Sequence, residues 1–180
     1  MSNASFLKMI QTRTATVAIG ASTFRNQGAS NVVSNTREFL KRLDLRQFSA
    51  KTATTFQNTL DRETKKLRNA LPVGAQNWGA ARKALNIFLR DVFYNYYLRD
   101  GYGFGKLEQW LELPLDKDAA RGLRKDSKDM DKQVPRWLGV KHLNCDISKD
   151  YQAAAERVAQ RRAIARVHLD LIYFRQKIDD

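Results

Sequence analysis

The sequence is poor in the residues that build cross-linked and metal-bound proteins. Its 180 residues include one cysteine, Cys145, and two histidines, His142 and His168, which lie far apart in the chain. A single cysteine excludes an intrachain disulfide framework, a cysteine-built structural zinc site and a cysteine-ligated iron–sulfur cluster. We therefore expect no metal and no cofactor. The low cysteine content is typical of a reducing, cytoplasmic compartment.

Long apolar runs are also absent, and acidic residues are few beside the basic ones. No apolar segment approaches the roughly 20 residues that a membrane-spanning helix needs, so we expect a soluble protein without a membrane partner. Lysine and arginine number 32 against 19 aspartates and glutamates, which gives a net charge of +13. Such a field attracts polyanions, and nucleic acid is the favoured partner. Charge alone would also suit an anionic membrane surface or an acidic protein.

Strand-like alternation is absent, whereas helical periodicity recurs along the chain, so the predicted fold class is all-α. The strongest signal runs from Trp78 to Leu98, where apolar residues recur every three or four positions. Residues 1–33 show no clear periodicity and are predicted to form a loop or irregular arm, and residues 126–147 a long ordered loop. Further helices are expected after a cap at Ser34 or Asn35, over 52–70, 106–111 and 117–125, after a cap at Ser148, and over 164–176.

Two polar residues stand out from this helical background. Lys83, in GAARKALNIFLRD (79–91), lies at the entrance of the strongest predicted helix and off its apolar stripe, a position that suits a cleft. Asp116 begins the predicted helix KDAARGLRK, where a carboxylate caps the first turn and is held rigidly. A fixed anion of this kind can stabilise a cation nearby. From spacing alone, a solvated lysine and an ordinary N-cap remain the simpler interpretations.

Two short segments are similar to those of a known enzyme family. G-A-A-R-K-A-L-N-I-F-L resembles the G-x-x-R-K-x-x-N-x-x-L segment that follows the hairpin of the helix-hairpin-helix DNA glycosylases, in their endonuclease III branch. Downstream, L-D-K-D-A-A-R is similar to the apolar-Asp-x-x-x-x-Arg context of that family. The resemblance covers about residues 79–124. It implies two helical lobes with nucleic acid between them, namely a central lobe over 34–112 and a second lobe, carrying Asp116, made of 1–33 plus 113–180.

The resemblance also implies a function and a set of site residues. It implies a DNA glycosylase that removes a damaged or modified base from DNA, with or without AP-lyase strand cleavage, in which Lys83 matches the nucleophile and Asp116 the aspartate. We expect the pKa of Lys83 to be lowered by desolvation or by the adjacent Arg82. A monomer acting on duplex DNA with a base turned out of the helix is expected. The implied nucleic-acid contacts are Trp78, Arg82, Asn86, Arg90 and Arg121, and the aromatic candidates for a wedge or base pocket are Trp78, Tyr94, Phe104, Trp110 and Trp137.

Departures from the family pattern keep other interpretations open. The segment LPVGAQNWG (71–79) is longer than the Leu-Pro-Gly-x-Gly hairpin of the family and places its glycines elsewhere, and the lysine-to-aspartate spacing is longer too. A second hypothesis is therefore a non-catalytic DNA-binding module on the same helical scaffold. A third is a basic helical protein that docks onto an acidic protein.

Overall fold

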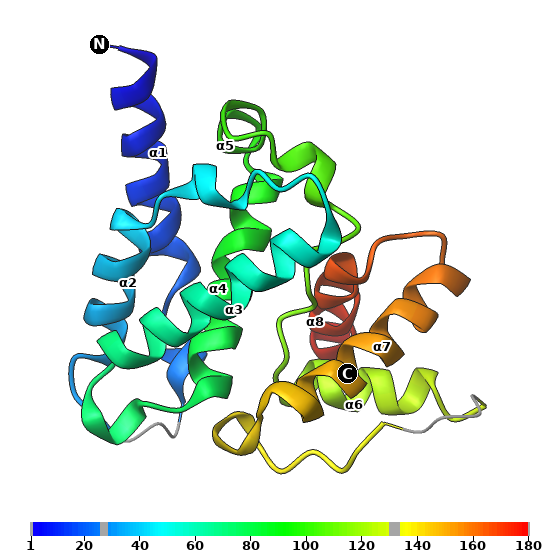
Figure 1. Ribbon diagram of the computed structural model, residues 1–180. Coiled ribbons are helices and arrows are strands. Elements are labelled where there is room, and N and C mark those ends of the chain that lie inside the picture. Colours follow the sequence, from blue (N-terminus) through cyan, green and yellow to red (C-terminus); the bar gives the residue numbers. More distant parts are fainter. Residues whose placement is uncertain (1, 26–28, 130–133, 180) are drawn as a thin grey trace.

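The computed structural model describes residues 2–25, 29–129 and 134–179, with side chains placed as far as Phe174 (Figure 1). Every regular element in these residues is helical, which confirms the all-α prediction. The α-helices are α1 (Asn3–Ala18), α2 (Val32–Arg42), α3 (Ala53–Ala70), α4 (Trp78–Tyr94), α5 (Tyr96–Gly101), α6 (Lys117–Asp126), α7 (Cys145–Arg161) and α8 (Leu169–Asp179). Short 3-10 turns are η1 (Ala21–Phe24), η2 (Leu45–Phe48), η3 (Val73–Ala75), η4 (Phe104–Leu107), η5 (Val140–His142) and η6 (Arg166–His168).

The helices form two lobes, with α1 to α5 in one and α6 to α8 in the other (Figure 1). Buried apolar residues fall into two clusters that follow this division. The chain passes from the first cluster to the second between Leu111 and Leu113. Ala165 and Val167, beside and within η6, belong to the first cluster although the flanking residues belong to the second. The turn η6 therefore ties the two lobes together.

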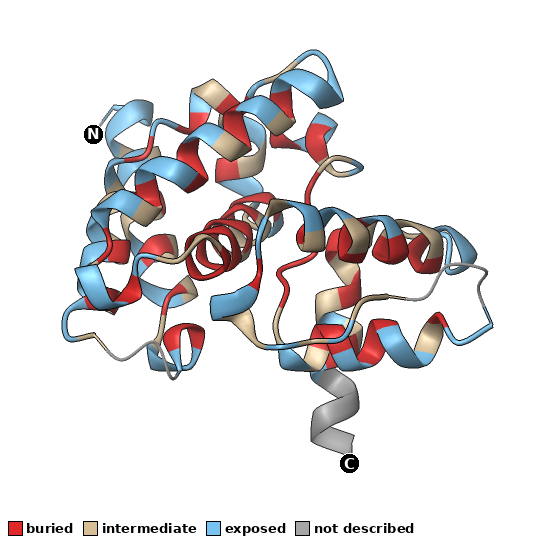
Figure 2. Cartoon of the chain, turned by 60° about the horizontal axis from the view of Figure 1, so that its bottom comes forward, coloured by how far each residue is buried: buried red, intermediate tan, exposed pale blue. Residues whose placement is uncertain are grey.

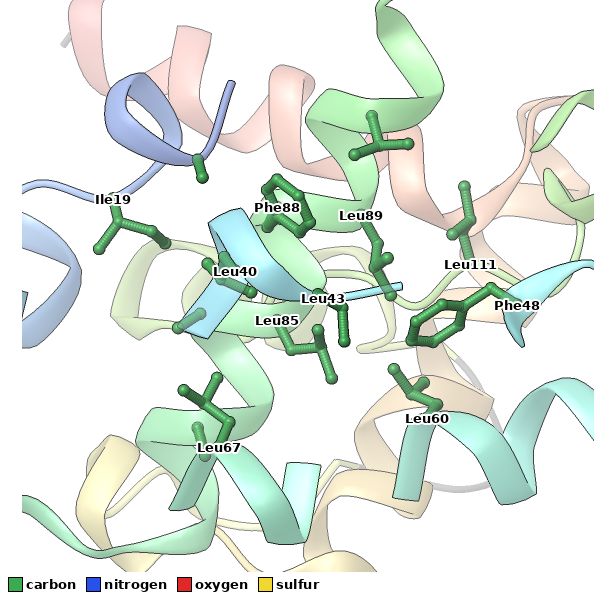
Figure 3. Packing of buried hydrophobic residues seen from close by; sticks show 14 of the residues in the cluster. Ile19, Leu40, Leu43, Phe48, Leu60, Leu67, Leu85, Phe88, Leu89 and Leu111 are labelled. Atoms are coloured by element: carbon green, nitrogen blue, oxygen red, sulfur yellow. The ribbon is translucent and has the colours of Figure 1, made fainter. Parts of the chain in front are cut away.

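Helix α4 runs through the middle of the first lobe and organises it. Asn77 caps the helix, because its side-chain oxygen accepts a hydrogen bond from the Ala80 amide at 2.8 Å. Most of its residues are buried, and it packs against α1, α3, α5 and η5 (Figure 2). Figure 3 labels ten apolar side chains of the first cluster, three of them on α4 and the others packed around it: Ile19, Leu40, Leu43, Phe48, Leu60, Leu67, Leu85, Phe88, Leu89 and Leu111. Burial of the stripe from Ala81 to Val92 agrees with the periodicity. The helix expected to run to Leu98 ends at Tyr94 instead, because Asn95 caps the separate helix α5, and Tyr96, which was counted in the stripe, is 64% exposed.

The amino-terminal segment differs from the expected irregular arm. Residues 3–18 form α1, which packs on α2, α4 and α5. Its docking depends on Gln11, which is 1% exposed and donates hydrogen bonds to the carbonyl oxygens of Leu40 at 2.9 Å and Leu43 at 2.7 Å. These bonds satisfy acceptors at the end of α2. Ala15 lies in the first cluster, so α1 belongs with the first lobe and not, as expected, with residues 113–180.

Several helix boundaries were also predicted incorrectly. Asn144, rather than Ser148, caps α7, and its side-chain oxygen accepts from the Ile147 amide at 2.9 Å. The helix expected over 106–111 is the short turn η4, and the final helix begins at Leu169. Part of the loop expected over 126–147 lies outside the described residues. No helix in the described part of the chain is both long enough and apolar enough to cross a membrane.

Candidate active site

A cleft of about 870 Å³ is lined by residues of both lobes. Helix α4 forms one wall with Lys83, Ile87, Arg90 and Tyr94, which recur at helical spacing along a single face. The opposite side comes from the start of α6, the segment 137–140 and α8. Because α4 is anchored in the first core and α6 in the second, the cleft brings together side chains whose backbones are fixed separately.

Lys83 and Asp116 meet in this cleft. The Lys83 ammonium nitrogen lies 3.6 Å from Oδ2 of Asp116, and only 7% of Lys83 is exposed. A lysine is almost never buried to this extent unless it is paired or functional. The structure therefore brings the two residues together as the hypothesis requires, while their catalytic roles stay a prediction.

The two carboxylate oxygens of Asp116 have different partners. Its Oδ1 accepts hydrogen bonds from the amides of Asp118 at 2.9 Å and Ala119 at 3.0 Å, which caps α6. Its Oδ2 faces Lys83. The capping bonds fix the carboxylate, so the second oxygen is held in one place without a contact of its own to the helix.

The environment of Lys83 lowers the pKa of its amine. Burial is the largest cause, because it penalises the charged form; the carboxylate of Asp116 opposes it, and the charge of Arg25, which also lines the cleft, adds to the lowering. Desolvation was expected from the sequence to lower this pKa. The charge of Arg82 was the other expected cause, but Arg82 is paired with two carboxylates, those of Asp61 and Glu112. A lowered pKa raises the neutral, nucleophilic fraction of the amine near neutral pH.

Arg82 and Asn86 are not cleft residues. We expected both to contact nucleic acid, but they are only 2% and 3% exposed and bind Glu112, which lies where the chain passes from the first cluster to the second. Burial would raise the pKa of Glu112, yet the charge of Arg82 and the hydrogen bonds from Arg82 and Asn86 lower it to about 2. Both side chains are buried in this ionic network, and neither lines the cleft.

Arg90 and Arg121, two of the predicted nucleic-acid contacts, do line the cleft. Arg90 is paired with Asp91 at 2.8 Å and with Asp170. The side chain of Arg121 is 60% exposed and lies 3.9 Å from Asp118, a weak and solvated pairing. Arg121 is thus the freer of the two to meet a ligand.

Some of the aromatic candidates line the cleft, and the others pack in or against the two cores. Tyr94 and Trp137 line the cleft. Phe104 and Trp110 pack in or against the first core, and Trp78 packs against the second cluster with the Arg82 guanidinium over its ring. Trp78 is therefore a structural residue rather than a cleft residue.

Several cleft residues were not singled out from the sequence, and Arg25 and Phe174 are examples. Arg25 follows η1 in a segment without periodicity, and Phe174 lies on α8, one helical turn after Asp170. No local motif marks either residue, because their place in the cleft depends on how η1 and α8 pack.

Comparisons of the chain with protein-family models, with curated proteins and with solved structures find no match. The case for a function therefore depends on the chemistry of the cleft.

Proposed function

We propose that the protein binds DNA in this cleft and removes a damaged or modified base, with Lys83 as nucleophile and Asp116 as the stabilising anion. The observation that carries the proposal is the buried Lys83 amine, its pKa lowered, 3.6 Å from a carboxylate that a helix start holds in place. The resemblance of 79–89 and 115–121 to the helix-hairpin-helix DNA glycosylases supports the same reaction.

The reaction follows from these two groups. The Lys83 nitrogen gives up a proton and bonds to the anomeric carbon while the bond from that carbon to the base breaks, and the base leaves with the electron pair and takes up a proton. Positive charge builds on the sugar as that bond breaks, and the Asp116 carboxylate stabilises it. Opening of the sugar ring leaves a Schiff base on Lys83. Loss of a proton from the neighbouring carbon then expels the 3′ phosphate and cuts the strand.

The burial of Lys83 favours an enzyme over a binding module. A lysine that only contacts phosphate works as a hydrated point charge and gains nothing from desolvation. A buried amine beside a carboxylate in a cleft is the arrangement in which perturbed pKa values accompany catalysis. Phosphate contacts would fall to exposed cleft residues, Arg25, Lys117 and Arg121, with the net charge of +13 aiding association.

Borohydride trapping tests this proposal. Duplexes carrying an abasic site or one of a panel of damaged bases are incubated with the protein and borohydride, which reduces a Schiff base to a stable adduct. We expect an adduct with wild type, none with Lys83→Ala, and a strong reduction with Asp116→Asn, which keeps a good helix cap but removes the charge. Lys66→Ala is the control, since Lys66 is an exposed lysine on α3 paired with Glu63.

The outcomes separate the hypotheses. Neither adduct nor base release across the panel contradicts the enzyme. Salt-dependent duplex binding that survives Lys83→Ala, without any adduct, would support the binding module instead. Negligible affinity for duplex DNA at moderate salt would support the acidic protein partner.

A further inference from the structure

The ionic network beside the cleft is built around the guanidinium group of Arg82. Its Nε and Nη2 donate to the two carboxylate oxygens of Glu112, each at 2.8 Å, and its Nη1 donates to Asp61 at 2.8 Å and to Thr64 at 3.0 Å. Asn86 adds a bond to Glu112 at 2.9 Å. All three nitrogens of the guanidinium are thus satisfied, and the pairing with Glu112 is the two-pronged geometry that fixes direction as well as distance.

This network joins the two segments that carry the reacting groups. Arg82 immediately precedes Lys83 on α4, and Glu112 lies four residues before Asp116. The chain between Glu112 and Asp116 is itself pinned, because Leu113 is fully buried and exchanges two backbone hydrogen bonds with the Gln152 side chain, at 3.0 and 2.8 Å. The Arg82–Glu112 pair therefore ties the helix that carries Lys83 to the held segment that leads to Asp116.

Stability alone gives little reason to keep such a network. Replacing a buried ion pair by well-packed apolar residues is often neutral or stabilising, because desolvation offsets the attraction between the charges. What an ion pair of this geometry supplies beyond an apolar contact is one defined relative position of its partners.

We propose that Arg82 and Glu112 are positioning residues, which fix the separation and direction between the Lys83 amine and the Asp116 carboxylate. Neither lines the cleft, so they act through the two reacting residues and not on a ligand. The inference rests on the proposed function, in which that separation matters for the chemistry. The positioning depends on the planar guanidinium group, which binds the carboxylate through two hydrogen bonds. A lysine at position 82 would keep the charge but would lose this two-pronged contact and with it the positioning.

The test compares Arg82→Lys and Glu112→Gln with Leu67→Ala. Leu67 is a fully buried residue of α3 outside the network, so its truncation lowers stability while leaving every charged partner of the network in place. Single-turnover borohydride trapping on a duplex with an abasic site is measured well below the unfolding temperature of each variant. A misplacement of about 1 Å at a reacting group costs on the order of 100-fold in rate. We expect losses of that size for both network variants, little change in DNA affinity, and a wild-type rate for Leu67→Ala.

A second readout needs no DNA. Pyridoxal 5′-phosphate forms a Schiff base with reactive lysines, borohydride fixes it, and peptide mass spectrometry reports the modification of Lys83 as a function of pH. In the network variants the wall around Lys83 loosens, so the midpoint of its labelling moves to higher pH, towards that of an ordinary lysine. In Leu67→Ala the midpoint stays at the wild-type value.

Folded Arg82→Lys and Glu112→Gln variants that keep the wild-type trapping rate and labelling midpoint would overturn the positioning role. If wild type forms no DNA adduct, the proposed function fails, while the labelling midpoint still decides the role of the network. Where a network variant does not fold, Asn86→Ala, which removes only the amide bond to Glu112, takes its place in both measurements.

Discussion

Replacing Gly79 by alanine should destabilise the protein and distort the cleft together. Gly79 lies in the first turn of α4 against η5, and an added Cβ would lie 2.0 Å from the Val140 carbonyl oxygen and 2.7 Å from the Leu143 Cβ. Real Cβ contacts are essentially never closer than 3.0 Å, so the backbone of η5 has to withdraw by about 1 Å. Overfilling of this kind costs about 1–3 kcal/mol. The clash is with backbone, which yields less easily than a side chain, so the upper end of this cost applies; after a return of at most ~1 kcal/mol from the better helix propensity of alanine, we expect a net loss of about 2 kcal/mol.

Urea unfolding followed by circular dichroism measures this loss, and Gly105→Ala is the matched control because its added Cβ meets nothing within 4 Å. Val140 lines the cleft, so Gly79→Ala should also slow borohydride trapping, whereas Gly105→Ala should not. Equal stabilities for the two variants would refute the reasoning, because the close approach of α4 to η5 would then not exist in solution.

Three further predictions concern charge. Lys83→Met should abolish trapping yet raise stability at neutral pH, by roughly 0.5–2 kcal/mol. Because the folded state lowers the pKa of Lys83, wild-type stability rises with pH until the pH reaches 10.5, the ordinary pKa of lysine. Thermal melts should show that this rise is flattened in the variant. Wild type should lose stability in acid as pH falls from 4.5 towards 2, since the folded state holds the pKa of Glu112 at about 2, and an acid titration of Glu112→Gln should lack this component of the loss. Arg121→Ala should weaken duplex binding and reduce the slope of log affinity against log salt by about one, whereas Arg46→Ala, on η2 away from the cleft, should leave the slope unchanged.

The sequence was most informative where local patterns decide the outcome. The apolar spacing of 78–98 predicted the central helix but not its end at Tyr94, and α3 and α6 begin and end within a residue or so of the predicted ranges. Asp116 caps α6 as its position at the head of KDAARGLRK indicated. The meeting of Lys83 with Asp116 followed from two motifs in order, although nothing in their spacing specified a distance.

The misplaced residues depend on partners far away in the chain. Arg82 was expected to face DNA because the family resemblance implied it, but Glu112, thirty positions later, binds it in the interior. Helix α1 was missed because few of its residues are buried and its docking relies on Gln11 contacting carbonyl groups of α2. Neither partner could be named before the fold was known.

The face of α4 that lines the cleft has a fixed length and a fixed angular spacing of its side chains. With a rise of 1.5 Å per residue, the face from Lys83 to Tyr94 measures about 16 Å, close to the length of five stacked steps along a DNA strand. Each further residue in an α-helix turns the following side chains by about 100°. One residue inserted after Lys83 would leave the amine in place and rotate Ile87, Arg90 and Tyr94 away from the cleft.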